Sequence, residues 1–402
     1  MSAGFKAYAS VLADPRARAF SAAGFLARLP LSMTGIGTVL LVSLTTGSFA
    51  RAGLVTGVAT AVGAVAAPLW GRVIDRAGQA RVLAGAGLLY AVGVGLVVAS
   101  VLRGWPLPVT LAAAVLSGLG FTTAGACVRA RWSHRLAGSP LLDTANAVEA
   151  VLDEVVFIVG PVLVTLLATS VHPALGLVVC AALGLLGAVA LAVQRSTEPP
   201  RRAAGSTRQG RLPYAVLTPV VLACWACGSV FGGMEVAVVA FARDAQVLAW
   251  SGVLLMCWAV GSLAAGVVTG SLVFRRSPVV RFRVGSALLA ASLLPLPLVS
   301  APWLMGVLLT VSGVAIAPTL IASVAVTQAS VPRDRITEAL SWTTTGLAAG
   351  VATGAAVLGP LLDRYGPTGG FVGVAGFGVV LAVAVLLVRE VRAPMPQPVA
   401  SR

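Results

Sequence analysis

Charged residues are scarce in this sequence. Only 10% of its 402 residues are Asp, Glu, Lys or Arg, whereas soluble globular domains carry about 25%. Hydrophobic residues make up 58% of the chain, and the mean hydropathy is +0.97. One soluble core could not bury so much apolar surface, so the sequence predicts an integral membrane protein.

The apolar segments also lack the two-residue alternation that is typical of membrane β-barrels. Helices of about 20 residues are therefore expected, because lipid cannot satisfy exposed backbone groups. Twelve spans are predicted. They cover residues 20–44, 52–70, 82–102, 107–129, 144–168, 173–193, 214–241, 247–271, 283–300, 302–326, 337–362 and 369–388.

The sequence offers no set of residues for metal, redox or nucleotide chemistry. His134 and His172 fall in predicted loops, without Cys or Asp at metal-ligand spacing. Cys224 and Cys227 have C-x-x-C spacing, but they lie in an apolar span and are predicted to be inert. No G-x-x-x-x-G-K-[ST] loop occurs, which disfavours ATP-driven transport. We therefore predict no catalytic residues, no cofactor and no metal.

The placement of the basic residues predicts how the chain is oriented. The net charge of +15 would suggest nucleic acid in a soluble protein. With a cytoplasmic N-terminus, four of the 28 basic residues lie outside (Arg51, Arg103, Arg243 and Arg364) and Arg28 lies within a span. The remaining 23 or so are cytoplasmic, so both termini are predicted to be cytoplasmic. These arginines are expected to contact anionic lipid rather than nucleic acid, and residues 1–18 are expected to form a short interfacial helix.

A polar segment at residues 194–211 separates six spans from six. It predicts an N-terminal half (1–193), a basic cytoplasmic linker (194–212) and a C-terminal half (213–402). A weak internal repeat supports two related halves, because residues 143–147 align with 336–340.

Between the second and third predicted spans the sequence reads GRVIDRAGQAR, at residues 71–81. This segment is predicted to be a short polar loop at a membrane face. It resembles the loop between the second and third helices of major facilitator superfamily transporters, whose pattern is roughly G-x-x-x-D-[RK]-x-G-[RQ]-x-[RK]. The matching residues are Gly71, Arg72, Asp75, Arg76, Gly78 and Arg81.

The resemblance covers the whole chain and is closest to bacterial drug and metabolite exporters. It implies an all-α integral membrane protein of twelve transmembrane helices in two pseudo-symmetric six-helix halves. By analogy, Gly71 and Gly78 permit tight turns, and Asp75 contacts the start of the eleventh helix in the outward-open state. Two motifs of proton-coupled exporters are incomplete. Ala114 stands where an arginine is common, and the fifth-span antiporter pattern keeps Gly160 and Pro161 but not its other glycines.

Three acidic residues in the fifth span are candidates for proton coupling. Glu149 and Asp153 share one helical face, and Glu154 lies about 100° away. Asp153 is expected near mid-bilayer and Glu149 at a shallower depth. A charge there costs at least about 2.5 kcal/mol, so such an acid must be paired, protonated or facing water. The alternative is a fixed structural network with Arg129 or Arg131.

Arg28 and Glu235 are the other ionisable residues expected deep in the membrane. Arg28 should pair with a fifth-span acid, either as a structural salt bridge or as part of a substrate site, and Pro30 should kink the helix beside it. The internal repeat places Glu235 opposite Thr34, so Glu235 is a candidate for proton coupling or substrate binding, or a structural acid. The predicted substrate-cavity residues are Arg28, Met33, Thr34, Thr122 and Glu235.

The function expected from these features is proton-coupled export of a small organic molecule by alternating access. Uptake or facilitated diffusion of a metabolite, such as a sugar or an amino acid, is the first alternative. A membrane-embedded enzyme or lipid-handling protein is the second, disfavoured by the lack of a nucleophile or metal set. The expected partners are the substrate, protons and the lipids of the cytoplasmic (inner) membrane, with the chain acting as a monomer.

Overall fold

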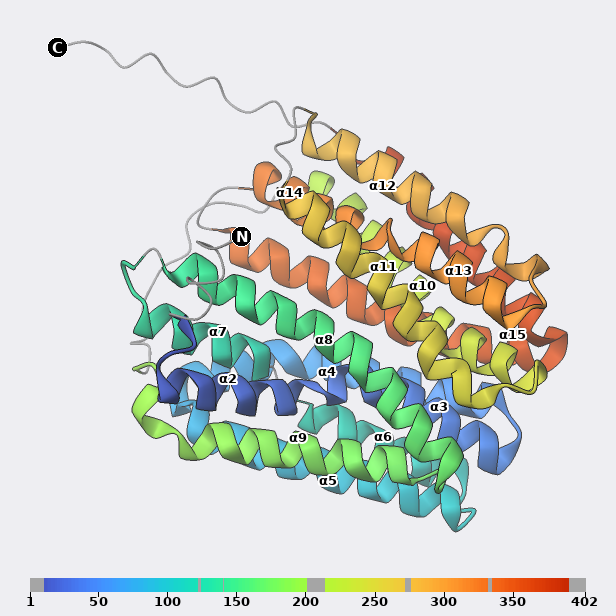
Figure 1. Cartoon of the computed structure of the whole chain (residues 1–402), viewed down its shortest axis with the longest axis horizontal. Helices are drawn as coiled ribbons and strands as arrows, with labels where there is room; N and C mark the ends of the chain where they lie inside the picture. The colour runs from blue at the N-terminus through green and yellow to red at the C-terminus, as the bar shows by residue number, and fades with distance from the viewer. Residues whose placement is uncertain are drawn as a thin grey trace.

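A computed structural model of the chain describes residues 11–121, 124–139, 141–200, 214–271, 276–331 and 335–389. These ranges are almost entirely α-helical and contain no strand. Figure 1 shows the helices running side by side in two groups, with α2–α9 below and α10–α15 above. Eleven helical segments of the described residues are long and apolar enough to cross a membrane.

Within the described ranges, the N-terminal half contains eight α-helices that form six crossings, because two of the crossings are interrupted. The first crossing is broken at Leu29, where Pro30 cannot donate an N–H to the preceding turn. The fourth is divided between α6 and α7. The helices are α2 (Pro15–Arg28), α3 (Pro30–Thr46), α4 (Phe49–Ala77), α5 (Gln79–Leu102), α6 (Leu107–Gly120), α7 (Ala124–Arg135), α8 (Leu141–Ser170) and α9 (Leu175–Val193).

The first crossing begins earlier than the sequence predicted. Asp14 caps α2 by accepting a hydrogen bond from the N–H of Arg16, at 2.9 Å, and Pro15 starts the helix. Residues 15–18 therefore belong to the first membrane helix and not to a separate interfacial one, while residues 1–10 lie outside the described ranges. Desolvation would raise the pKa of Asp14, but the Arg16 N–H and the Arg135 guanidinium lower it below its ordinary value.

The C-terminal half ends in a helical hairpin. Helix α15 is divided into two helical parts at Gly366, whose backbone is not helical, with φ 64° and ψ -166°. The parts pack side by side, since a Cβ on Gly373 would meet Leu358 at 2.3 Å. The two parts of α15 correspond to the eleventh and twelfth predicted spans, 337–362 and 369–388. The helices are α10 (Tyr214–Asp244), α11 (Ser251–Ser271), α12 (Pro278–Leu293), α13 (Pro302–Gly313), α14 (Ile316–Ser330) and α15 (Ile336–Leu386).

The predicted loop at residues 71–81 is mostly helical, so this prediction was wrong in its extent. Helix α4 continues to Ala77, α5 begins at Gln79, and Gly78 alone makes the turn, with φ 91°. Gly71 lies inside α4, and a Cβ there would meet nothing within 4 Å. Only Gly78 therefore has the turn-forming role that was expected of both glycines.

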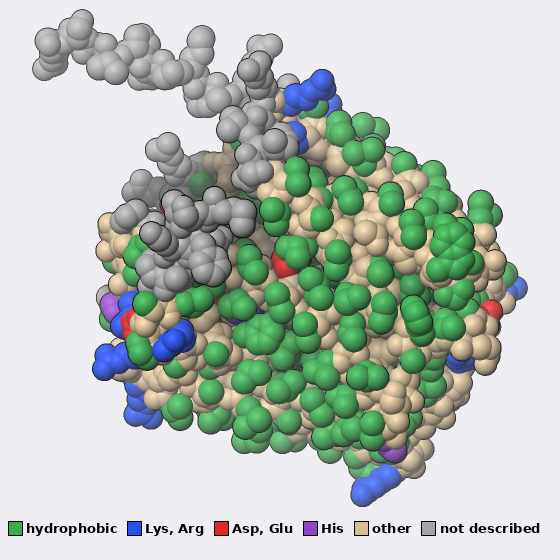
Figure 2. All heavy atoms as spheres, in the orientation of Figure 1, with side chains coloured by type: hydrophobic (Ala, Val, Ile, Leu, Met, Phe, Trp, Pro, Cys, Tyr) green, Lys and Arg blue, Asp and Glu red, His purple; other side chains and the backbone are tan. Residues whose placement is uncertain are grey.

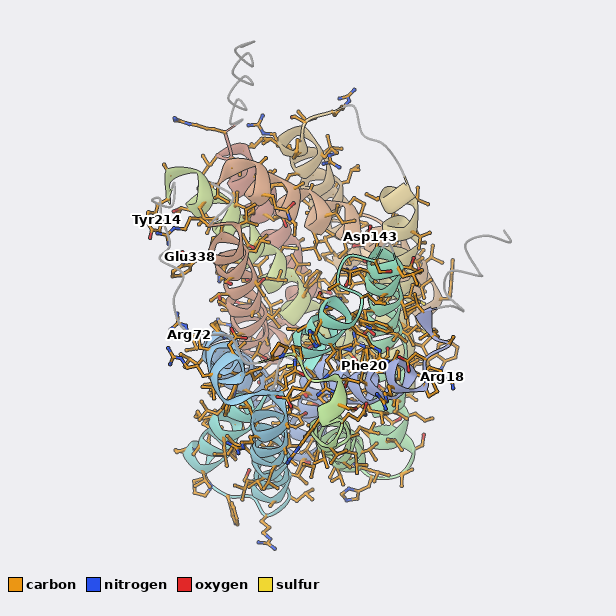
Figure 3. The ribbon with its side chains drawn as sticks, turned by 90° about the vertical axis from the view of Figure 1, so that its left-hand side faces the viewer. Arg18, Phe20, Arg72, Asp143, Tyr214 and Glu338 are labelled. Carbon is orange, nitrogen blue, oxygen red and sulfur yellow. The ribbon has the colours of Figure 1, made fainter. Side chains whose placement is uncertain are left out.

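The molecule has one end rich in arginine and one end with little. Figure 2 shows hydrophobic side chains over the middle of the visible face and basic side chains gathered mainly at its left. Figure 3 looks onto that left end, where Arg18, Arg72 and Asp143 from the N-terminal half and Tyr214 and Glu338 from the C-terminal half are labelled. We call this the arginine-rich end, and the opposite one the arginine-poor end.

The two halves meet mainly along three helix pairs, α4 with α15, α8 with α11, and α3 with α10. Several glycines allow very close backbone approach between the halves, and Gly53 and Gly252 approach most closely. A Cβ on Gly53 would lie 2.0 Å from the carbonyl oxygen of Ala355, and one on Gly252 would lie 2.3 Å from that of Pro161. Both glycines lie near the start of a helix at the arginine-poor end, so the closest packing between the halves is there.

Candidate functional site

A cluster of charged side chains lies within the N-terminal half, where α2 passes α8. Arg28 donates from Nη2 to Oε2 of Glu149, at 2.6 Å, and from Nη1 to Oδ1 of Asp153, at 2.7 Å. Its Nε also donates to the backbone carbonyl of Gly24, at 3.0 Å. The expected pairing of Arg28 with a fifth-span acid is thus present, with two acids instead of one.

Glu149 is the most enclosed member of the charged cluster. Its side chain is fully buried, with 0% exposure, against 30% for Asp153. Besides Arg28, its Oε1 accepts hydrogen bonds from the hydroxyl of Ser21, at 2.5 Å, and from Nε1 of Trp132, at 2.9 Å. Burial therefore ranks Glu149 as the more enclosed of the two acids. Its carboxylate oxygens therefore accept from three donors, one of which is a cation.

Asp153 is shared between two arginines. Its Oδ1 accepts from Arg28, while its Oδ2 accepts from Nη2 of Arg129, at 2.5 Å. The Arg129 side chain is 43% exposed, so this side of the cluster is open. Of the two arginines named as structural partners, Arg129 is in contact and Arg131 is not. Glu154 forms no hydrogen bond or ion pair with the described residues.

Glu235 lies at the junction of the two halves. It belongs to α10, and its Oε2 is so close to α3 that a Cβ on Gly35 would lie 2.2 Å away. Within the described ranges it makes neither a hydrogen bond nor an ion pair. Gly35 is seven residues after Arg28, or about 10 Å along the helix axis. The unpaired acid and the charged cluster are therefore about two helical turns apart.

Two other predicted cavity residues, Met33 and Thr34, pack inside the N-terminal half and not at the junction of the two halves. Met33 has 0% exposure and packs near Gly160 of α8. The hydroxyl of Thr34 bonds to the carbonyl of Pro30 and shares a 2.6 Å hydrogen bond with the hydroxyl of Tyr90. Both side chains thus serve packing inside the N-terminal half in this conformation. Thr122 lies outside the described residues.

The turn at Gly78 is tied to α7 and to the start of the linker. Oε1 of Glu198 accepts the backbone N–H of Gln79 at 2.5 Å, which caps α5. The side-chain carbonyl of Gln79 accepts from Nε of Arg131 at 2.8 Å, and Arg131 also donates to the hydroxyl of Thr197 at 2.8 Å. Arg131 therefore fastens the linker to the N-terminal half.

The remaining residues of the 71–81 segment are not part of this network. Arg72, Asp75 and Arg76 are exposed, and Arg81 begins the exposed face of α5. Asp75 forms no hydrogen bond or ion pair with the described residues. Among the described residues, Asp75 therefore makes no hydrogen bond or ion pair to the start of α15, and α4 and α15 meet at the arginine-poor end.

Sequence reasoning missed the neutral donors around the acids. Ser21 precedes Arg28 by two helical turns, so a search for polar residues on the face of Arg28 could have found it. Trp132 also carried a usable signal, since an indole N–H within a membrane span needs an acceptor. Nothing in the local sequence of Glu198 distinguishes it from an ordinary loop acid.

Comparison with known proteins identifies the family. The sequence profile of the Major Facilitator Superfamily matches residues 20–335. No curated protein matches the sequence.

Solved structures share the fold at low sequence identity. The nucleoside transporter NupG is 15% identical, with a TM-score of 0.71 over 94% of this chain and 100% of its own. The POT family transporter PepTSo is 10% identical, with a TM-score of 0.68 over 93% and 97%. A bacterial homologue of the human lysosomal transporter Spinster, in an inward-facing and unoccupied conformation, is 15% identical, with a TM-score of 0.64 over 93% and 95%.

Proposed function

Because this chain belongs to the Major Facilitator Superfamily, we propose that it is a secondary transporter that exports a small organic molecule in exchange for protons. The proposed location is the cytoplasmic membrane of a bacterium. The arginine-rich end faces the cytoplasm, in accord with the positive-inside rule. Its arginines lie where they can contact anionic lipid headgroups.

The observation that carries the proposal is the contrast between Glu149 and Asp153. Glu149 is buried and has three donors, so its charge is held in place. Asp153 is 30% exposed, and its neighbour Arg129 is 43% exposed, so this acid is the more accessible of the two. Protonation of Asp153 would leave Arg28 paired with Glu149 and would release Arg129. A proton can thus change the charge of the cluster without dismantling it.

Glu235 is the second proposed proton or substrate site. A carboxylate in the middle of a membrane protein is costly to charge unless a cation or several donors stabilise it. Glu235 has no such partner among the described residues, which favours its neutral form while the halves are closed around it. Movement of α10 away from Gly35 would open the carboxyl group to water or to a substrate. Its protonation is thereby linked to the motion of the halves.

The contacts between the halves fit alternating access. Their closest backbone approaches lie toward the arginine-poor end, at Gly53 and Gly252. Toward the arginine-rich end, Asp75 is exposed and unpaired within the described chain. This arrangement supports an inward-facing state, closed on the outside. Rocking of the halves would then bring Asp75 to the start of α15, where an acid can interact with the helix N-terminus.

Flux measurements in sealed liposomes test this proposal. Substrates are first chosen by stabilisation of the purified protein, because a ligand that binds only the folded state raises apparent stability. A pH gradient should then drive accumulation by the parent protein. Asp153→Asn should abolish accumulation against a gradient and spare exchange down it. Asp143→Asn is the matched control, since Asp143 is an exposed acid in the first turn of the same helix.

The outcomes separate the alternatives. Flux that is insensitive to the pH gradient in the parent would indicate facilitated diffusion or uptake instead of proton-coupled export. Conversion of a compound without vectorial movement would favour a membrane-embedded enzyme. If Asp153→Asn still concentrates substrate with unaltered pH dependence, Asp153 is structural and the coupling site lies at Glu235, Glu154 or Glu149.

A further inference from the structure

A single carboxylate forms the hydrogen bonds that cross between the two halves. Asp363 lies at the arginine-poor end of α15, three residues before the break at Gly366. Its Oδ1 accepts the N–H of Phe49 at 2.7 Å, and its Oδ2 accepts the N–H of Ala50 at 2.9 Å and the hydroxyl of Ser48 at 2.8 Å. Between described residues, no other hydrogen bond joins the halves.

These bonds complete the N-terminus of a helix in the opposite half. The first N–H groups of an α-helix lack partners within the helix, and they carry the positive end of its dipole. Ser48 caps α4 in the usual way, because its hydroxyl accepts the N–H of Arg51 at 3.2 Å. Phe49 and Ala50 have no such partner in their own half, and Asp363 supplies it. An acid of the C-terminal half is thus the second cap of α4.

Two further contacts close the same junction. The guanidinium of Arg243, at the end of α10, lies 5.0 Å from the ring centroid of Phe49, within the range of a cation–π interaction. A Cβ on Gly359 would lie only 2.4 Å from the carbonyl oxygen of Phe49. The C-terminal half therefore surrounds the start of α4 with an anion, a cation and a glycine that permits backbone contact.

We propose that Asp363 is the gating residue of the arginine-poor end. It keeps this end closed by capping α4, and it must release the cap before the halves can separate there. This inference rests on the proposed function insofar as it assumes alternating access, but the cap requires neither substrate nor protons. Charge-assisted hydrogen bonds to partly exposed amides, together with the helix dipole, predict a shift of roughly tenfold in the open-to-closed ratio when the charge is removed.

The test measures the opening of this end directly. Spin labels are placed at Arg51→Cys in α4 and Ala249→Cys in the 3-10 helix Leu248–Trp250, two exposed positions on opposite halves. The five native cysteines are first replaced by alanine. Distances between the labels are recorded in detergent, without substrate or pH gradient. Asp363→Asn should raise the population with the longer distance roughly tenfold, and Asp363→Glu should restore the closed population.

Arg364→Gln is the matched control. Arg364 is the exposed neighbour of Asp363, but its guanidinium lies over Tyr365, 5.2 Å from the ring centroid and within its own half. It should leave the distances unchanged. If Asp363→Asn does not fold, Ser48→Ala removes one of the three bonds and should give a smaller shift in the same direction.

Equal distance distributions for the parent, Asp363→Asn and Ser48→Ala would overturn the gating role. Because the distance measurement is independent of flux, a failure of proton-coupled transport in liposomes would not affect the conclusion that Asp363 holds this end closed. Conversely, an unchanged distance distribution would leave the proposed transport activity standing.

Discussion

Removal of Arg28 is predicted to destabilise the protein far more than removal of Asp153. In Arg28→Gln, Glu149 keeps its two neutral donors but loses its cation while 0% exposed. Breaking a buried ion pair in this way costs about 3–5 kcal/mol of unfolding free energy. In Asp153→Asn, Arg28 retains Glu149 and the half-exposed Arg129 becomes solvated. The cost there should be smaller, about 1–2 kcal/mol, because Asp153 is only partly buried and Arg28 keeps its other acidic partner.

The double variant sharpens this prediction. Arg28→Gln with Glu149→Gln removes both charges, so no uncompensated charge remains buried. Its cost should be smaller than the sum of the two single costs by about 2–3 kcal/mol. Unfolding of the purified protein in detergent, followed by loss of helical signal, provides the measurement. Equal costs for Arg28→Gln and Asp153→Asn, or strict additivity in the double variant, would refute the idea that Glu149 holds a fixed charge.

Three other predictions follow from single contacts. Trp132→Phe keeps the packing on Phe20, whose ring centroid is 4.7 Å away, but loses the donor to Glu149 and should cost about 1.5–3 kcal/mol of unfolding free energy; no loss of stability would mean that the indole bond is unimportant. Asp75→Asn should slow turnover more than it weakens substrate affinity, because Asp75 is unpaired within the described chain in this state and is proposed to reach the start of α15 only after the halves rock. Lost affinity with unchanged turnover would contradict that role. Glu235→Cys, in a background without native cysteines, should react with a water-soluble thiol reagent, and substrate should slow the reaction; a cysteine that stays inert in both inward-open and outward-open states would place this position in packing.

The sequence predicted the crossings well, because long apolar runs follow from the lipid environment alone. Helix breaks were partly predictable. Pro30 removes a donor, so the break beside it follows from local chemistry. The extent of the 71–81 loop did not follow, since polar residues such as Arg72 extend a helix beyond the membrane as readily as they form a loop. Hydropathy marks the edge of the lipid and not the end of a helix.

The candidate site was predictable only as far as helical spacing allowed. The four-residue spacing of Glu149 and Asp153 places both acids on one face, and the structure places Arg28 between them. Which acid is enclosed depends on Trp132, which reaches it from α7. The packing of Met33 inside its own half likewise depends on how α3 is rotated against α8. Both features depend on tertiary contacts, which cannot be inferred from a single sequence.

The distance in sequence between Arg28 and Glu149 has a consequence for biosynthesis. The two residues are 121 positions apart, so Arg28 enters the membrane well before its partner has been made. At about 5–20 residues per second, the wait is roughly 6–24 s. An unpaired arginine at the centre of a span costs about 2.5–3.5 kcal/mol on insertion scales. During that interval the apolar α3 must keep the first crossing inserted, and weakening its leucines and valines should cause failed insertion in cells even where the finished protein would be stable.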